Sequence, residues 1–243
     1  MREWSGKRYW LVGASEGLGR ALALKMSRAG AELILSARSG DRLRDLAAEL
    51  PGRSRVVTMD ISDRDSVHEA WEEVGEIDGM IFLAGVYWPQ SAKEWDAEKV
   101  EAMFDINLTG AVRVLGHVVP AFVARDAGHI VLTGSLSGFR GLPGAIGYSA
   151  SKAGLYSLAE SIDGDLKDTD VEVQLLNPGF IKTRLTDKND FKMPAIMEPE
   201  AAADIFFEHM TGGGFARSFP TLFSLVFRLS VVLPHGLYRR LFF

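Results

Sequence analysis

The chain has 243 residues, of which 47% are hydrophobic and 24% are charged, so it can bury a sizeable apolar core. A formal net charge of -5 argues against a nucleic-acid-binding protein, because phosphate recognition requires a clustered cationic surface. The absence of cysteine excludes disulfides and thiol chemistry, and the five histidines lack the spacing of metal ligands, so we expect no metal site.

Short apolar runs alternate with helical patterns along most of the chain. We expect strands at 9–12, 32–36, 55–59, 79–84, 129–133 and 171–176, and helices near 17–29, 40–50, 63–74, 98–124 and 148–167. Most of these strands are apolar on successive residues, which is typical of strands covered on both faces in a parallel sheet. The alternation therefore predicts a doubly wound α/β sheet, and no linker divides residues 1–243 into separate domains.

The chain changes character after residue 183. A loop over about 184–197 precedes a helix that starts near Glu198, and the segment 219–243 is unusually apolar but carries Arg228, Arg239 and Arg240. This last segment has two interpretations. It either packs as a helix on the protein or a partner subunit, or lies on a membrane surface with its arginines near the headgroups.

A glycine-rich turn, VGASEGLGR, directly follows the first expected strand and opens a helix. Gly13, Gly17 and Gly19 lack a Cβ, so a pyrophosphate can approach the backbone, and the helix N-terminus supplies N–H donors. The turn predicts a dinucleotide site, although a glycine-rich turn without a ligand would have the same sequence.

The end of the second expected strand indicates which dinucleotide binds. Enzymes that use NAD place an acidic residue there, whereas this chain has Arg38 and Ser39, which suit a 2′-phosphate. We therefore expect NADP(H), with NAD(H) as the alternative. Asp60, after the third strand, is placed to reach the adenine amino group, but a strand-end cap would look the same.

Tyr148 and Lys152 are four residues apart in the helical stretch GYSASKAGL, so they share one helix face. A protonated lysine beside a phenol lowers the phenol pKa, which would make Tyr148 a proton donor and acceptor near neutral pH. Ser135, after the fifth strand, can donate a hydrogen bond to a substrate carbonyl oxygen.

Together these motifs make the chain similar to a classical short-chain dehydrogenase/reductase (SDR) from about residue 7 to 185. The resemblance implies a Rossmann-type, three-layer α/β/α fold in one domain, with the cofactor-binding core at about 7–183 and a substrate roof and C-terminal segment at 184–243. It implies a catalytic set of Tyr148 as general acid/base, Ser135 as carbonyl polariser, Lys152 on the ribose, and Asn107 as the anchor of a proton-relay water. The cofactor contacts that it implies are Gly13, Ser15, Glu16, Gly17, Leu18, Gly19, Arg38, Ser39, Asp60, Ile61, Ala84, Gly85, Tyr148, Lys152, Pro178, Gly179, Ile181 and Thr183.

Two residues depart from the family pattern. Val12 replaces the usual threonine before the first motif glycine, and Leu83 replaces the asparagine of the Asn-Ala-Gly motif. Both family residues mainly brace the sheet and the turn, so their loss affects local rigidity more than the chemistry.

The substrate pocket should be apolar. We expect its roof to contain Leu185, Phe191, Met193, Pro194, Ile196 and Met197, and its floor Leu136, Phe139, Leu142 and Trp88. Such a lining fits a hydrophobic ketone or aldehyde. The prediction is an NADP(H)-dependent carbonyl reductase; an epimerase or dehydratase of the same family and a non-catalytic NADP(H) sensor are the alternatives.

The expected partners and location follow from the same features. Residues 1–13 lack the apolar stretch of a signal peptide, so we expect a cytoplasmic protein, with peripheral membrane contact if the segment 219–243 is interfacial. By analogy with the family, a homodimer or homotetramer should form through the helices near 98–124 and 148–167.

Overall fold

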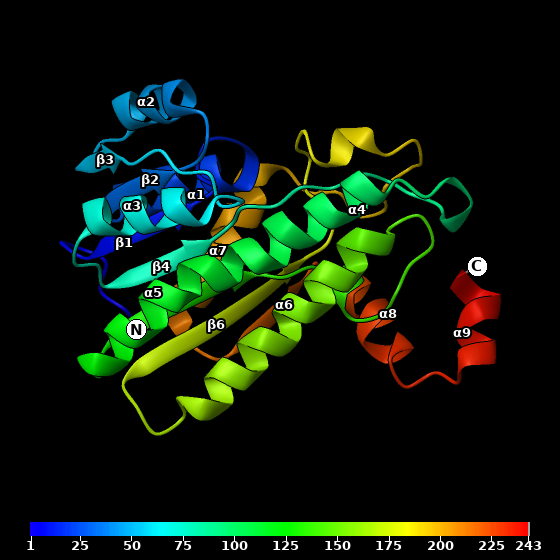
Figure 1. The fold of residues 1–243 in the computed structure, drawn as a ribbon. Coiled ribbons are helices and arrows are strands. Elements are labelled where there is room, and N and C mark those ends of the chain that lie inside the picture. Colours follow the sequence, from blue (N-terminus) through cyan, green and yellow to red (C-terminus); the bar gives the residue numbers. More distant parts are fainter. Residues whose placement is uncertain (243) are drawn as a thin grey trace.

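The structure, a computed structural model, describes residues 1–242 and consists of one parallel sheet between two layers of helices (Figure 1). The strand order is β3-β2-β1-β4-β5-β6-β7. The strands are β1 (Arg8–Val12), β2 (Glu32–Ser36), β3 (Ser54–Val56), β4 (Gly79–Phe82), β5 (Gly128–Thr133), β6 (Val171–Pro178) and β7 (Ala216–Phe219). The order reverses between β1 and β4, and in open α/β sheets a ligand crevice forms at such a point, beyond the carboxyl ends of the strands.

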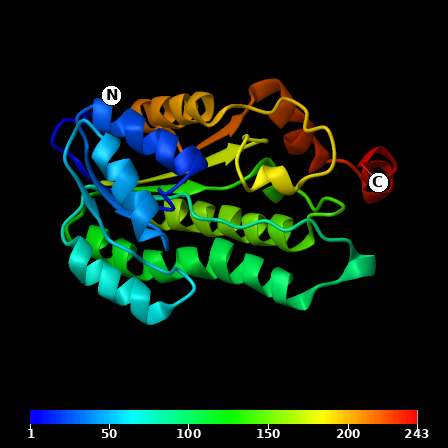
Figure 2. The same ribbon diagram turned by 90° about the horizontal axis from the view of Figure 1, so that it is seen from above.

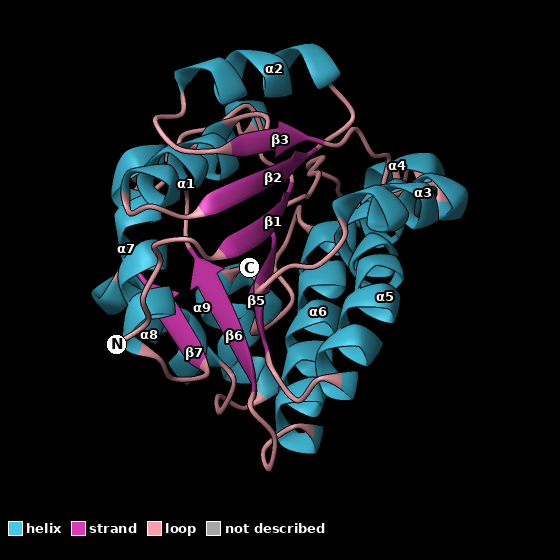
Figure 3. Cartoon of the chain, turned by 90° about the vertical axis from the view of Figure 1, so that its left-hand side faces the viewer, coloured by secondary structure: helices cyan, strands magenta, loops and turns pink. Residues whose placement is uncertain are grey.

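The helices cover both faces of the sheet, as Figure 3 shows from one end. One layer contains α1 (Gly17–Arg28), α2 (Gly40–Glu49) and α7 (Pro199–Gly212); the other contains α3 (Arg64–Val74), α4 (Ala97–Phe104), α5 (Gly110–Ala124) and α6 (Ile146–Asp165). The short helices are η1 (Ala92–Glu94), η3 (Leu136–Gly138) and η4 (Thr186–Lys188). The predicted doubly wound, three-layer α/β/α architecture is confirmed. That the chain forms a single domain stays a prediction.

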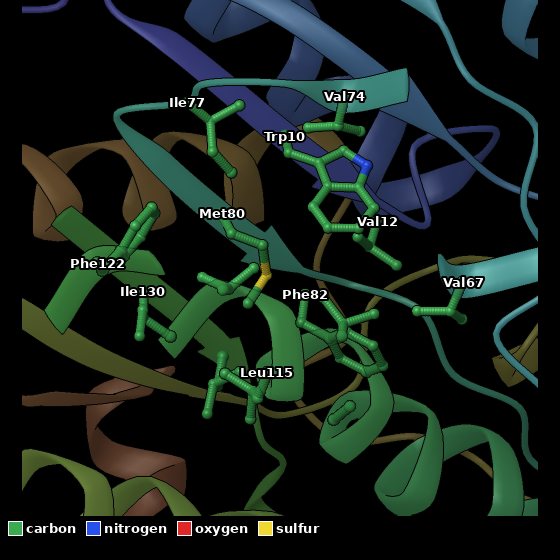
Figure 4. Close-up of a cluster of buried hydrophobic side chains, with 14 of the residues drawn as sticks. Trp10, Val12, Val67, Val74, Ile77, Met80, Phe82, Leu115, Phe122 and Ile130 are labelled. Carbon is green, nitrogen blue, oxygen red and sulfur yellow. The ribbon is translucent and has the colours of Figure 1, made fainter. Parts of the chain in front are cut away.

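The two faces of β1 contribute to two different cores. Trp10 belongs to the core between the sheet and the layer of α3, α5 and α6, where Figure 4 shows it near Phe82. Tyr9 belongs to the core beneath α1 and α7. Because successive side chains of a strand point to opposite faces, an uninterrupted apolar strand supplies both cores.

One polar network crosses the buried sheet. Tyr9 reaches over Gly79, where a Cβ would lie 2.2 Å from its Cε1 atom, and its hydroxyl lies 2.9 Å from Nδ1 of His129. His129 Nε2 lies 2.9 Å from Oε1 of Gln174. Burial lowers the pKa of His129 from 6.5 to about 3, so the imidazole is neutral and stays neutral at physiological pH.

The fourth helix pattern, expected over 98–124, forms one helix from Ala97 to Ala124 with a π-helical segment, η2 (Asp105–Thr109), at its centre. By length and composition this helix could cross a membrane, but its Val118 and Phe122 are buried in the core. Val112 and Val123 of α5 are exposed, and the expected subunit contact through α5 and α6 stays a prediction.

The C-terminal part differs from expectation in two ways. Strand β7 pairs with β6 at the edge of the sheet and was not expected, and the apolar segment forms two helices, α8 (Thr221–Ser230) and α9 (His235–Phe242). The helix expected near Glu198 is confirmed, since Glu198 is the N-cap of α7.

Candidate active site

A cleft of about 710 Å³ lies at the carboxyl ends of the strands. Its walls come from the loops that follow the strands β1 to β6, together with α6 and α8. All the residues predicted to contact a cofactor line this cleft, as does Ser135. The structure therefore brings together segments from Gly13 to Thr183 that are far apart in the sequence.

The glycine turn forms the floor of one end of the cleft. Gly13 has φ +97°, and a Cβ there would lie 2.5 Å from the backbone nitrogen of Ala84. Gly17 has φ +53°, and a Cβ there would lie 2.7 Å from Cγ2 of Thr183. Helix α1 begins at Gly17 without a side-chain cap, so its first N–H groups are left for another acceptor. The close backbone surface at Gly13 and Gly17, together with the first N–H groups of α1, fits the pyrophosphate of a dinucleotide.

Glu16 joins two sides of the cleft. Its Oε2 atom accepts hydrogen bonds from Nη1 of Arg42 and Nη1 of Arg184, each at 2.8 Å. Arg42 lies on α2 beside the predicted 2′-phosphate position, and Arg184 lies on the roof segment. The sequence analysis did not single out either arginine, because nothing local in the sequence links them to the glycine turn.

Arg38 and Asp60 lie at the adenosine end of the cleft. The Oδ1 atom of Asp60 accepts from the N–H of Ser62 at 2.9 Å and from its hydroxyl at 2.6 Å. Burial acts to raise the pKa of Asp60, but these hydrogen bonds and the charge of Arg38 lower it below its usual 3.8. Asp60 is therefore an ionised strand-end cap that also lines the cleft.

Tyr148 and Lys152 lie on α6 one turn apart, and Lys152 Nζ is 5.8 Å from the centroid of the Tyr148 ring. Lys152 donates to the carbonyl oxygen of Thr133 at 2.8 Å. The hydroxyl of Ser135 lies 2.9 Å from that of Ser137 and is also hydrogen-bonded to Tyr148. The three predicted groups thus meet at the inner end of the cleft.

The expected effect of Lys152 on Tyr148 was wrong. Burial raises the pKa of Tyr148 to about 12; the hydrogen bond from Ser135 lowers it and the neighbouring Tyr87 raises it. Burial also lowers the pKa of Lys152 to about 8. Desolvation is the largest cause of the pKa shift of both groups, so Tyr148 is a protonated phenol at neutral pH.

Asn107 does not line the cleft, because its side chain is fully buried in the π-helical segment. Its Oδ1 accepts from the N–H of Val86 at 2.7 Å, and its Nδ2 donates to the Val86 carbonyl at 3.0 Å and to the Ser151 hydroxyl at 3.1 Å. The amide therefore holds the segment after β4 against α6, and its expected part in a water relay stays a prediction.

The sequence matches the family model of the short chain dehydrogenases over residues 7–193, which is more than three quarters of the chain. The chain belongs to the short-chain dehydrogenase family. An uncharacterised oxidoreductase of Myxococcus xanthus is 37% identical to this short-chain dehydrogenase over 245 residues, covering 98% of the chain and 97% of the relative. An uncharacterised oxidoreductase of Mycobacterium tuberculosis is 35% identical over 192 residues, covering 74% of the chain and 75% of the relative.

Solved structures share the fold. A short chain dehydrogenase from Burkholderia cenocepacia in complex with NADP matches this short-chain dehydrogenase with a TM-score of 0.88 at 23% identity, over the full length of both chains. A relative from Burkholderia phymatum in complex with NAD matches with a TM-score of 0.86 at 24% identity, covering 95% of this chain and 94% of that one.

The substrate end of this short-chain dehydrogenase was predicted in part. Trp88, Leu136, Leu142, Leu185 and Phe191 line the cleft as expected. The expected lining residues Phe139, Met193, Pro194, Ile196 and Met197 do not: the Phe139 ring packs against Tyr156, and Met197 bridges to Ile181. The sequence analysis missed Tyr87, Phe180, Lys188, Phe223 and Phe227, of which the last two come from α8.

Proposed function

We propose that the protein reduces an apolar ketone or aldehyde to an alcohol with NADPH. The observation that carries this proposal is the meeting of Ser135, Tyr148 and Lys152 at the inner end of a glycine-floored cleft. The residues that line this cleft would hold a nicotinamide dinucleotide, which would supply the hydride for the reduction. The protein then has to hold the carbonyl oxygen and give it a proton.

Proton donation is assigned to Tyr148. With its pKa raised to about 12, the phenol is protonated at physiological pH and can give its proton to the carbonyl oxygen as that atom gains electrons. The Ser135 hydroxyl, hydrogen-bonded to Tyr148, can donate to the same oxygen and hold it in place. The Lys152 ammonium favours the tyrosinate that remains after the proton has left.

The preference for NADPH over NADH is assigned to Arg38. Its guanidinium is exposed at the lip of the cleft, next to Ser39, and β2 ends at Ser36 without an acidic residue. Arg42, on the first turn of α2, adds a second guanidinium at the same lip. A 2′-phosphate would find bidentate donors there, whereas the end of β2 lacks the carboxylate that would accept hydrogen bonds from the ribose hydroxyls of NADH.

The residues that line the substrate end of the cleft indicate the class of substrate. Tyr87 packs edge-on against Tyr148 with their ring centroids 5.1 Å apart, and Phe180 packs against Phe191 and Phe223. Aromatic rings thus line the substrate end of the cleft. They favour hydrophobic substrates over phosphorylated sugars.

The proposal is tested by the rate of NADPH oxidation over a panel of ketones, aldehydes and β-ketoacyl thioesters. Tyr148→Phe should lose activity by about a thousandfold, within the usual range for removal of a proton donor, and should keep its affinity for NADPH. A matched Tyr156→Phe variant, whose ring lies elsewhere on α6, should remain active. Normal turnover by Tyr148→Phe would refute the assignment.

A further inference from the structure

The two C-terminal helices and the turn between them expose many apolar side chains to solvent. We call this the tail face: it consists of Leu222, Leu225, Val226, Leu229, Val231, Val232, Leu237 and Leu241, whose exposed fractions run from 40% to 82%. In Figure 2, α9 projects beyond the end of the sheet, at the periphery of the molecule. Soluble proteins rarely expose large contiguous apolar patches unless the patch binds something.

The tail face is held in a fixed position. Tyr238 of α9 is buried, and its hydroxyl donates to the carbonyl of Gly141 at 2.6 Å. Arg140 stacks over the Tyr238 ring at 3.9 Å and donates to the carbonyls of Ser230 and Leu233, in the turn between the two helices. The apolar residues are therefore displayed by an anchored pair of helices and need little further ordering to bind.

Along the sequence, the charged residues near the C-terminus are segregated by sign. All 32 acidic side chains of the chain lie before residue 209, whereas the segment after it carries Arg217, Arg228, Arg239 and Arg240. The last three arginines are exposed on α8 and α9, the helices that carry the tail face. A protein with a net charge of -5 thus ends in a segment whose charged side chains are all cationic.

We propose that the tail face docks the protein on an anionic lipid bilayer. Exposed leucines and valines beside arginines are the composition of helices that lie in the membrane interface. A second copy of the chain is the competing occupant, but a two-fold contact would bring the same arginines of both copies together, and neither α8 nor α9 carries an acidic side chain to offset them. Anionic headgroups compensate these charges.

Docking would place a lipid-soluble substrate close to the cleft. Helix α8 carries Leu222 and Leu229 on its exposed face, whereas its Phe223 and Phe227 line the cleft. A single helix therefore separates the bilayer from the substrate end. The docking itself depends on neither the cofactor nor catalysis. It can therefore be tested independently of the proposed reduction.

Co-sedimentation of the full chain with vesicles tests the proposal. Vesicles of phosphatidylcholine containing phosphatidylglycerol should bind the protein, and pure phosphatidylcholine should bind it far less. Leu222→Ser with Leu229→Ser should weaken binding by at least about tenfold. Arg239→Gln with Arg240→Gln should weaken it by about 30-fold at low salt.

The matched controls change exposed residues elsewhere. Trp95→Ser with Ile196→Ser, and Arg28→Gln with Arg64→Gln, should bind like the unmodified chain. Far-ultraviolet circular dichroism shows whether each variant is folded.

Three outcomes would overturn the proposal. One is failure of the folded, unmodified chain to bind the anionic vesicles, and another is equal binding to both kinds of vesicle. The third is a stable dimer in sedimentation velocity that the leucine variant dissociates, because a second copy would then cover the tail face.

Discussion

Replacing the buried lysine should make the protein more stable and inactive. Lys152 is 3% exposed, and burial lowers its pKa from 10.5 to about 8. This lowering of the pKa means that keeping the ammonium charged in the folded state costs about 3 kcal/mol at neutral pH. Lys152→Met keeps most of the side-chain volume and removes that penalty.

The gain is partly offset, because the variant loses the hydrogen bond from Lys152 to the Thr133 carbonyl. Leaving a buried carbonyl without this donor costs about 1–2 kcal/mol. We therefore expect a net stabilisation of about 1–2 kcal/mol near neutral pH, which for a chain of this length raises Tm by about 2–8 °C. Lys167→Met, on the exposed turn after α6, is the matched control and should leave Tm unchanged.

The pH dependence distinguishes this explanation from improved packing. In the wild type the folded-state pKa lies below the unfolded value, so the penalty is fully present below about pH 8 and is relieved as the pH rises towards 10.5. The advantage of Lys152→Met in urea or thermal unfolding should therefore shrink across that window. An advantage that stays constant from neutral pH to about pH 10, or no advantage at neutral pH, would refute the reasoning.

Two other changes test the cofactor site and the buried network. Arg38→Asp should weaken NADPH binding by at least about tenfold while leaving NADH binding within a few-fold, as measured by fluorescence titration; an unchanged ratio of the two affinities would reject the phosphate assignment. For His129, the folded-state pKa of about 3 lies below the unfolded 6.5, so stability is fully present above pH 6.5 and falls as the pH drops. In urea unfolding near pH 4.5, the free energy of unfolding should have fallen by about 3 kcal/mol because of this residue. A folded His129→Gln variant should lack that part of the fall. If both proteins lose stability equally in acid, the role assigned to His129 is contradicted.

Much of the fold and of the cofactor end of the cleft could be predicted because their signals are local. Apolar runs on successive residues indicate strands covered on both faces, and β1 supplies both cores as such a run should. In a parallel sheet the carboxyl ends of the strands share one edge, so Gly13, Arg38, Asp60 and Ser135, each placed after a strand, had to meet there.

The parts that were missed depend on partners distant in the sequence. Strand β7 is short and carries a single large apolar side chain, Phe219, and pairing with β6 makes it a strand. Phe223 and Phe227 belong to an apolar helix whose inner and outer faces could not be distinguished until the helix was packed.

The spacing of Tyr148 and Lys152 by itself determined that the two side chains share a helix face, because that follows from the pitch of an α-helix. Their protonation was decided only by the tertiary structure. The cost of burying a charge depends on everything that surrounds it, so desolvation reversed the direction of the pKa shift expected for Tyr148.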